Sequence, residues 1–252
     1  MRRNIFPLAL LLTVLLTGCG RRGPSLPAPT VQLSTTAAQV DVGGEESPSP
    51  APTPSETVEP ITATAEAIPQ EDALVRVVDY IPGVVVELKY ATEDNFTGTV
   101  IYDFSDAYLR YGTVRKLAQV QDALEERGMG LKIWDAYRPV AAQFRLWEVC
   151  PDPTYVANPN TGFSSHSRGN TVDVTLVDAE GAELSMPTGF DDFSPLADRD
   201  YSDCEAVPAD NARLLEELMK EHGFKPYAGE WWHFTDSTAY GVENDFSQAE
   251  QG

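Results

Sequence analysis

Apolar positions repeat along this chain with periods that change from segment to segment, and each period predicts an element. Two runs rich in β-branched and aromatic residues, 74–80 and 84–90, flank Ile81-Pro82-Gly83 and predict two strands joined by a turn. In residues 113–127 the apolar side chains recur at helical spacing, and Gly128 is a stop signal. We therefore expect two strands followed by a helix.

The second half of the pattern alternates between the same two periods. Three further apolar runs predict short strands at residues 131–137, 171–177 and 231–235. Pro139 opens a second helix that reaches about Val149, and a third helix is expected over 209–221, ended by Gly223. Strands and helices mix without a regular βαβ repeat. This order favours an α+β fold, with a largely antiparallel sheet flanked by helices in a single domain.

The start of the chain has a composition of its own. Arg2 and Arg3 precede an apolar run over residues 5–16, which is too short for a membrane-spanning helix. A basic start, a short apolar run and small residues at its end are typical of an export signal. The ending Leu-Thr-Gly-Cys resembles the lipobox of bacterial lipoproteins, which implies acylation of Cys19 and a lipid anchor. The alternative is an ordinary secretory signal in which Cys19 is incidental.

A proline-rich stretch follows. Residues 20–70 hold nine of the nineteen prolines and no aromatic residue. Such a stretch buries too little apolar surface to offset the entropy of ordering it, so disorder is expected. We predict a lipoprotein signal peptide at 1–18, a lipid-anchored Pro/Ser/Thr-rich tether at 19–70, one folded domain at 71–246 and a disordered tail at 247–252.

The chain is acidic. Its net charge is −21, and removing residues 1–18 takes away two arginines and leaves −23. Binding of phosphates requires clustered Lys and Arg, so this charge argues against nucleic acid and anionic headgroups as partners. The lipid anchor is then the only contact expected with a membrane. Export would place Cys150 and Cys204 in an oxidising setting where they could form a disulfide; the alternative is two separate buried thiols.

Two short clusters place histidines near acids. "SSHSRGNTVD" puts His166 seven residues before Asp173, and "EWWH" puts Glu230 three residues before His233. A hydrolytic zinc site takes three protein ligands of N or O type and keeps one position open for water. His166, Asp173 and His233 supply such a set, which leaves Glu230 as the general base. Taken alone, each cluster is more often a hydrogen-bonded surface pair or a core histidine, so the hypothesis depends on both.

Four motifs occur in order across residues 74–236: "LKYATEDNFTG", "WDAYRP", "SSHSRGNTVDVTLVD" and "EWWHF". Together they resemble the zinc D-alanyl-D-alanine dipeptidases, which are related to D,D-carboxypeptidases and to the hedgehog and lysostaphin-type metallopeptidase fold. The resemblance implies that fold and one zinc ion (Zn2+) per chain, with His166, Asp173 and His233 as ligands and Glu230 as base. It adds Arg138, in "WDAYRP", as the residue that stabilises the oxyanion.

The resemblance also implies contacts with a dipeptide substrate. It places Tyr90 and Asp191 at the free amine of the dipeptide. Asp192 is adjacent, and Asp191 is preferred because it directly follows Phe190, as the family pattern requires. Ser165 is a candidate contact for the substrate carboxylate.

These expectations combine into an exported, lipid-anchored zinc dipeptidase of a bacterial cell envelope, facing outside the cytoplasm. Its substrate would be D-Ala-D-Ala or a related small D-amino-acid dipeptide, in turnover or scavenging of cell-wall fragments. Family members that give vancomycin resistance act in the cytoplasm, and the export signal argues against that role. The alternatives are a D,D-carboxypeptidase acting on peptidoglycan stem peptides, and a catalytically silent wall-binding lipoprotein. Glu230 argues against the silent protein, since a pure binder needs no base.

Overall fold

The computed structural model describes residues 67–246. The expected signal peptide, Cys19, nearly all of the tether and the tail at 247–252 lie outside the described residues, so those predictions stay predictions. Within residues 67–246, none of the helices combines the length and the apolar character that crossing a bilayer requires.

The described part of the chain contains two sheets and three α-helices. The strands are β1 (Leu74–Arg76), β2 (Val85–Val86), β3 (Tyr108–Arg110), β4 (Met129–Asp135), β5 (Thr171–Asp178), β6 (Phe224–Pro226) and β7 (His233–Asp236). The α-helices are α1 (Tyr111–Glu125), α2 (Val140–Val149) and α3 (Ala206–Glu221). Short 3₁₀ helices lie at Val77–Asp79, Lys89–Ala91, Ser165–Arg168, Pro195–Ala197 and Tyr201–Asp203.

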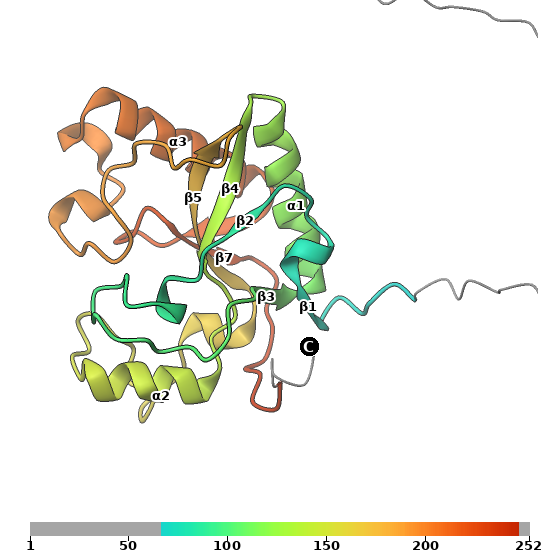
Figure 1. Ribbon diagram of the computed structural model, residues 1–252, viewed down its shortest axis with the longest axis vertical. Helices are drawn as coiled ribbons and strands as arrows, with labels where there is room; N and C mark the ends of the chain where they lie inside the picture. The colour runs from blue at the N-terminus through green and yellow to red at the C-terminus, as the bar shows by residue number, and fades with distance from the viewer. Residues whose placement is uncertain (1–66, 247–252) are drawn as a thin grey trace, which may run out of the picture. The chain divides into compact units, whose positions relative to one another are not determined.

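The main sheet has five strands in the order β2-β4-β5-β7-β6. β2 runs parallel to β4, and every other neighbouring pair is antiparallel. β1 and β3 form a separate antiparallel pair. α1 and α3 contact each other and the main sheet, whereas α2 lies apart from them at the other end of that sheet (Figure 1). The predicted α+β class and the largely antiparallel sheet are confirmed.

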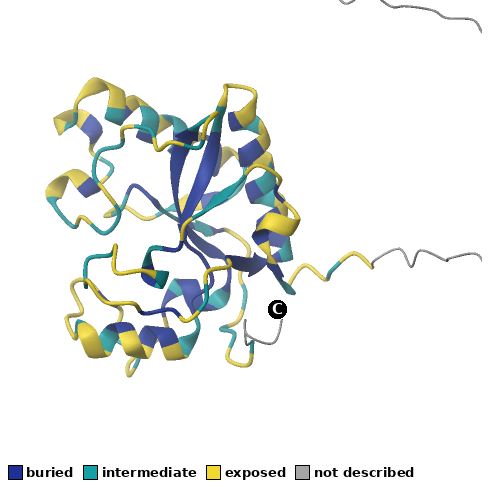
Figure 2. Cartoon of the chain, viewed as in Figure 1, coloured by how far each residue is buried: buried dark blue, intermediate teal, exposed yellow. Residues whose placement is uncertain are grey.

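β4 and β5 form the centre of the core, and both are drawn almost entirely as buried in Figure 2. On β5, Val172, Val174 and Leu176 are fully buried. Successive side chains on a strand point to opposite faces, so these three share one apolar face and Asp173 belongs to the other. Burial of a carboxylate at the centre of a sheet is unusual and marks that second face as a candidate site.

The prediction of two strands joined by a turn over residues 74–90 is confirmed only for Leu74–Arg76 and Val85–Val86, and these two strands do not pair with each other. β1 ends at Arg76, and the backbone N–H groups of Tyr80 and Ile81 donate to the Val77 carbonyl, which turns the chain. β1 pairs with β3 instead, and β2 pairs with β4 in the other sheet. Val77 is fully buried, so its apolar side chain fills the core from a turn and not from a strand.

The other predicted elements are confirmed with shifted ends. α3 begins three residues before the predicted position 209, because Pro208 is tolerated in the first turn of a helix, where its missing N–H needs no partner. β7 begins at His233, since Trp231 and Trp232 lie in the turn before it. These shifts move ends by two or three residues and leave the order of elements unchanged.

Cys150 and Cys204 are separate thiols. Cys150 follows the last residue of α2, and the Cys204 Sγ lies 3.7 Å from Asp203 Oδ1. Both cysteines are free, and each packs partly buried against the apolar core. The disulfide considered from the sequence is therefore not formed, and the alternative of two separate thiols holds.

Candidate active site

Strand pairing places three polar residues in a row across the main sheet. Asp173 of β5 lies opposite His233 of β7 on one side and opposite Asp135 of β4 on the other. Residues directly opposite each other in an antiparallel pair project from the same face. The register therefore brings together side chains that are far apart in the sequence.

His166 reaches this row from the 3₁₀ helix that precedes β5. The helix ends at Gly169, whose φ of 71° is left-handed and where a Cβ would lie 2.6 Å from Leu74 Cδ2. Both conditions require glycine, which explains the small residue between His166 and Asp173. The His166 Nδ1 lies 2.8 Å from the Ala136 carbonyl oxygen. A carbonyl only accepts, so Nδ1 carries the proton and the Nε2 lone pair is free.

The candidate ligand atoms of His166, Asp173 and His233 all lie within 4.8 Å of one another. His166 Nε2 is 3.3 Å from Asp173 Oδ2, and His233 Nδ1 is 3.0 Å from Asp173 Oδ1. The His233 contact is short but lacks the geometry of a hydrogen bond, so Asp173 Oδ1 is buried without a hydrogen-bond donor among the described residues. A buried carboxylate oxygen without a donor is costly unless a cation compensates it. Two imidazoles and this carboxylate fit zinc, which takes three such ligands and leaves a fourth position open.

The charges of the cluster support one another. Burial by itself would raise the pKa of Asp173, but His166 and His233 outweigh it and hold that pKa below its ordinary value. Burial likewise lowers the pKa of His166, while Asp173 and Asp135 outweigh burial and raise it. Asp173 therefore remains an ionised carboxylate although it is buried within the sheet.

Glu230 stands beside the cluster, in the loop between β6 and β7. Its Oε2 is 3.4 Å from His233 Nδ1, and its side chain is 23% exposed. Burial raises the pKa of Glu230 above its ordinary value, and the neighbouring His233 opposes that effect. A carboxylate with a raised pKa at a cavity wall is suited to accepting and returning a proton.

Arg138 lies between β4 and α2, where three side chains hold its guanidinium. The Asp135 carboxylate accepts from Nε at 3.1 Å and from Nη2 at 2.5 Å, and Gln143 Oε1 accepts from Nη1 at 2.9 Å. Tyr102 accepts from Nε at 3.2 Å and donates to Asp135 at 2.6 Å. The guanidinium also lies 5.0 Å from the centre of the Tyr90 ring. These contacts fix a buried cation in one orientation.

Tyr90 and Asp191 form a second polar pair, in which the Tyr90 hydroxyl donates to Asp191 Oδ2 at 2.6 Å. Asp191 has a φ of 53°, which is uncommon for a residue with a side chain. Burial raises the pKa of Asp191 to about 8, with the hydrogen bond from Tyr90 opposing it. Asp192 is exposed and accepts from the backbone N–H of Ser194. Of the two adjacent aspartates, it is thus Asp191 that pairs with Tyr90.

One cavity of about 490 Å³ contains the side chains singled out from the sequence. Those that line it are Tyr90, Arg138, Ser165, His166, Asp173, Asp191, Glu230 and His233. The Ser165 Oγ is 3.5 Å from His233 Nε2. The volume is typical of sites for small molecules. The third histidine, His222, lies outside this cavity, with its Nδ1 3.2 Å from Gln119 Oε1.

Sequence reasoning missed the residues that hold Arg138. Asp135 is fully buried and lies inside the "WDAYRP" motif, three residues before Arg138, so its spacing could have suggested the partnership. Tyr102 and Gln143 carry no comparable signal. They meet the guanidinium only because the fold brings their segments together.

Comparison with known proteins agrees with this geometry. The family model described as "D-ala-D-ala dipeptidase" matches residues 70–251. A D-alanyl-D-alanine dipeptidase of Escherichia coli K12 is 39% identical over 153 residues, covering 61% of this chain and 79% of the relative. Those of Streptomyces coelicolor and Enterococcus faecalis are 36% identical over 181 residues and 32% over 176, covering 62% of this chain and 88% and 87% of the relatives. A solved vancomycin-resistance D,D-pentapeptidase with Zn(II) aligns over 67% of this chain and 88% of its own, at 16% identity and a TM-score of 0.36, too distantly to bear on the site.

Proposed function

We propose that this chain, which belongs to the D-Ala-D-Ala dipeptidase family of zinc peptidases, hydrolyses the D-Ala-D-Ala dipeptide outside the cytoplasm as a lipid-anchored protein of the cell envelope. Membership of that family makes it a hydrolase. One observation carries the substrate: the three-ligand cluster, the base Glu230 and the Tyr90–Asp191 pair share one cavity. The basic start, the apolar run and Cys19 support the envelope location.

Zinc would be held by His166 Nε2, the Asp173 carboxylate and His233 Nδ1. The hydrogen bond from His166 Nδ1 to the Ala136 carbonyl fixes the ring so that Nε2 faces the cluster. A bound zinc ion supplies a Lewis acid that polarises the scissile carbonyl and makes water more acidic. The remaining tasks fall to the chain itself: moving a proton, stabilising charge and orienting the dipeptide.

Glu230 is proposed to move the proton. As a carboxylate it accepts a proton from the water molecule whose oxygen attacks the peptide carbonyl carbon. It returns that proton to the nitrogen of the leaving D-Ala when the C–N bond breaks, and the products are two D-Ala molecules. The raised pKa of Glu230 suits both directions of transfer, because it brings proton affinity closer to neutral pH.

Arg138 is proposed to stabilise the negative charge that develops on the carbonyl oxygen. Its guanidinium is buried at the cavity wall, and Asp135 and Gln143 fix its orientation before any substrate arrives. A cation already oriented in a partly dry site stabilises developing charge without reorganising in the reaction.

The Tyr90–Asp191 pair is proposed to bind the free amine of the dipeptide, and Ser165 its carboxylate. An ammonium beside Asp191 favours the ionised carboxylate, so its pKa falls and it releases a proton on binding. A wall pentapeptide has no free amine next to its terminal D-Ala-D-Ala bond. A site that binds a free amine at this position therefore favours a dipeptidase over a D,D-carboxypeptidase.

The test is to incubate the full chain with D-Ala-D-Ala, L-Ala-L-Ala and a wall pentapeptide, each with and without a chelator. We expect the protein to release D-Ala from D-Ala-D-Ala and to cleave neither of the other two peptides. The chelator should abolish this activity. Cleavage of the pentapeptide would establish the carboxypeptidase instead. If the zinc-loaded protein cleaves none of the three peptides, the remaining hypothesis is the catalytically silent wall-binding lipoprotein.

A further inference from the structure

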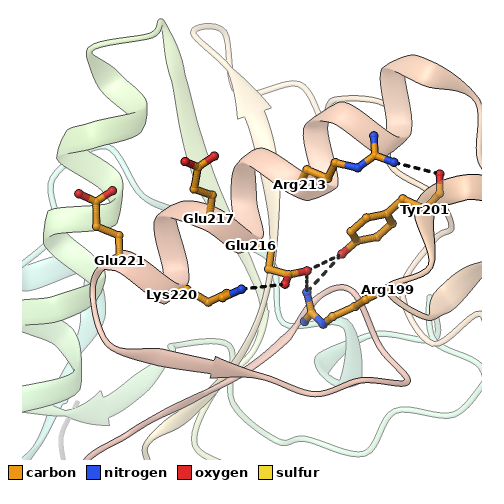
Figure 3. A pocket seen from close by; sticks show the side chains of 7 residues that line it. All are labelled: Arg199, Tyr201, Arg213, Glu216, Glu217, Lys220 and Glu221. Carbon is orange, nitrogen blue, oxygen red and sulfur yellow. Dashed lines mark hydrogen bonds and ion pairs between the residues drawn. The ribbon is translucent and has the colours of Figure 1, made fainter.

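Arg199 lines a hollow of about 810 Å³ beside α3 (Figure 3). Its guanidinium contacts the backbone of the loop that carries Glu230. Arg199 follows the 3₁₀ helix Pro195–Ala197, and its side chain is only 11% exposed. A guanidinium has five N–H donors in a rigid, planar fork. All five have a partner in this structure, three in the loop and two beside α3.

Three of the donors bond to backbone carbonyls of one loop. Arg199 Nε donates to the Tyr227 oxygen at 2.7 Å, and Nη2 donates to the oxygens of Glu230 at 2.9 Å and His233 at 3.0 Å. Two of the three carbonyls that Arg199 contacts therefore belong to the proposed base, Glu230, and to the proposed zinc ligand, His233.

The loop's own hydrogen bonds are longer. The N–H of Tyr227 donates to His233 at 3.1 Å, that of His233 to Glu230 at 3.3 Å, and that of Glu230 to Tyr227 at 3.5 Å. Each of the three carbonyls thus accepts one bond from the loop and one shorter bond from Arg199. Bonds near 3.5 Å contribute little, so Arg199 supplies the shorter of the two bonds to each of these three carbonyls.

The other two donors anchor the guanidinium. Nη1 donates to Glu216 Oε2 of α3 at 3.1 Å and to the Tyr201 hydroxyl at 3.3 Å, and that hydroxyl donates to Glu216 at 3.1 Å. The guanidinium also lies 4.5 Å from the centre of the Phe234 ring. Figure 3 shows Tyr201 and Glu216 converging on Arg199. Helix α3 therefore fixes the position from which Arg199 holds the loop.

We propose that Arg199 is a positioning residue: by holding the loop backbone, it sets the places of the base Glu230 and the zinc ligand His233. This inference rests on the function proposed above. Lysine keeps the charge but has three donors on a single nitrogen, and it cannot bridge three carbonyls and two further acceptors in a plane. Arg199→Lys should therefore release the loop while leaving a cation in the hollow.

The test compares full-length Arg199→Lys with a matched control, Arg213→Lys. Arg213 lies in the same hollow, but its hydrogen bonds go to Asp210 and to the Tyr201 carbonyl. We expect Arg199→Lys to bind zinc about 10–100-fold more weakly in chelator competition, as when the partners that orient a ligand are lost. With saturating zinc, its kcat should fall more than its KM rises, because Tyr90 and Asp191 lie outside the loop. The control should match the parent in both measurements.

Parental zinc affinity in folded Arg199→Lys, or an equal loss in Arg213→Lys, would overturn the proposal. A lower melting temperature with unchanged zinc affinity would also overturn it, since that pattern describes a merely structural residue. If Arg199→Lys does not fold, Glu216→Gln weakens the anchor and keeps the guanidinium. Weaker zinc binding by Glu216→Gln supports the proposal, and a zinc affinity equal to that of the parent contradicts it. Zinc affinity is measured without substrate, so failure to hydrolyse D-Ala-D-Ala would remove the proposed function and leave this test intact.

Discussion

Replacing Asp191 by asparagine should stabilise the metal-free protein and lower the affinity of the zinc-loaded protein for a dipeptide. Asparagine has nearly the same shape, and its amide oxygen can still accept the hydrogen bond from Tyr90. It carries no charge at any pH. The variant therefore removes the free energy of burying an ionisable carboxyl and leaves the surrounding contacts in place.

The magnitude follows from the pKa. Burial raises the pKa of Asp191 from 3.8 to about 8. Between these two values the folded protein holds a proton that the unfolded chain has released. The free energy of unfolding of the parent should then fall by about 1.4 kcal/mol for each pH unit on account of this group. At pH 7 the accumulated cost reaches about 4 kcal/mol, and below the unfolded value it vanishes.

The assay is urea unfolding of the parent, Asp191→Asn and Asp192→Asn from about pH 5 to about pH 8, with chelator present throughout. The chelator matters because a bound cation would alter the charges that face Asp191. The stability of Asp191→Asn relative to the parent should grow steadily as the pH rises. Asp192 is exposed, so its variant should follow the parent. Parallel curves for parent and Asp191→Asn would refute the argument that burial raises this pKa.

The same variant tests substrate binding. With zinc restored, Asp191→Asn should raise the KM for D-Ala-D-Ala by about 100-fold, because a hydrogen bond to a charged partner contributes roughly 3 kcal/mol. An unchanged KM would exclude Asp191 from amine binding. The pair of outcomes, greater stability with weaker binding, distinguishes a functional carboxyl from a structural one.

Three further variants test the rest of the site and the location. Glu230→Gln should retain zinc and lose about 10²–10⁴-fold in kcat, as for removal of a general base; near-parental turnover would show that another group takes the proton. His166→Ala should lose zinc by elemental analysis, because one of three ligands is gone, and parental zinc content would contradict the ligand assignment. Cys19→Ala should move the protein from the membrane to the soluble fraction, and persistent membrane association would argue for a different anchor.

The order of the elements could be predicted from sequence, and their pairing could not. Period and stop signals located α1, β4, α2 and β5 to within about two residues. The same rules misread the segment at 74–90, because a β-branched residue such as Val77 can be buried from a turn as well as from a strand. Which strands become neighbours depends on contacts across the whole domain.

Some residues of the site could likewise be predicted from the sequence and others could not. His166, Asp173, Glu230 and His233 could be found because each pair is local and its chemistry is distinctive. Tyr102 and Arg199 could not, since the partner of each in the site lies more than 30 residues away in the sequence. Groups that orient reactive side chains are assembled by the fold.

The placement of β7 has a consequence for how the protein matures. β7 lies between β5 and β6, so His233 joins Asp173 across 60 residues of sequence. A nascent chain that ends before Glu230 holds only His166 and Asp173 of the four residues. Contacts of such high sequence separation are slow to form, because the entropy of closing the intervening loop opposes them. Capture of zinc is therefore tied to completion of the chain, and unfinished or truncated copies would remain inert toward peptides.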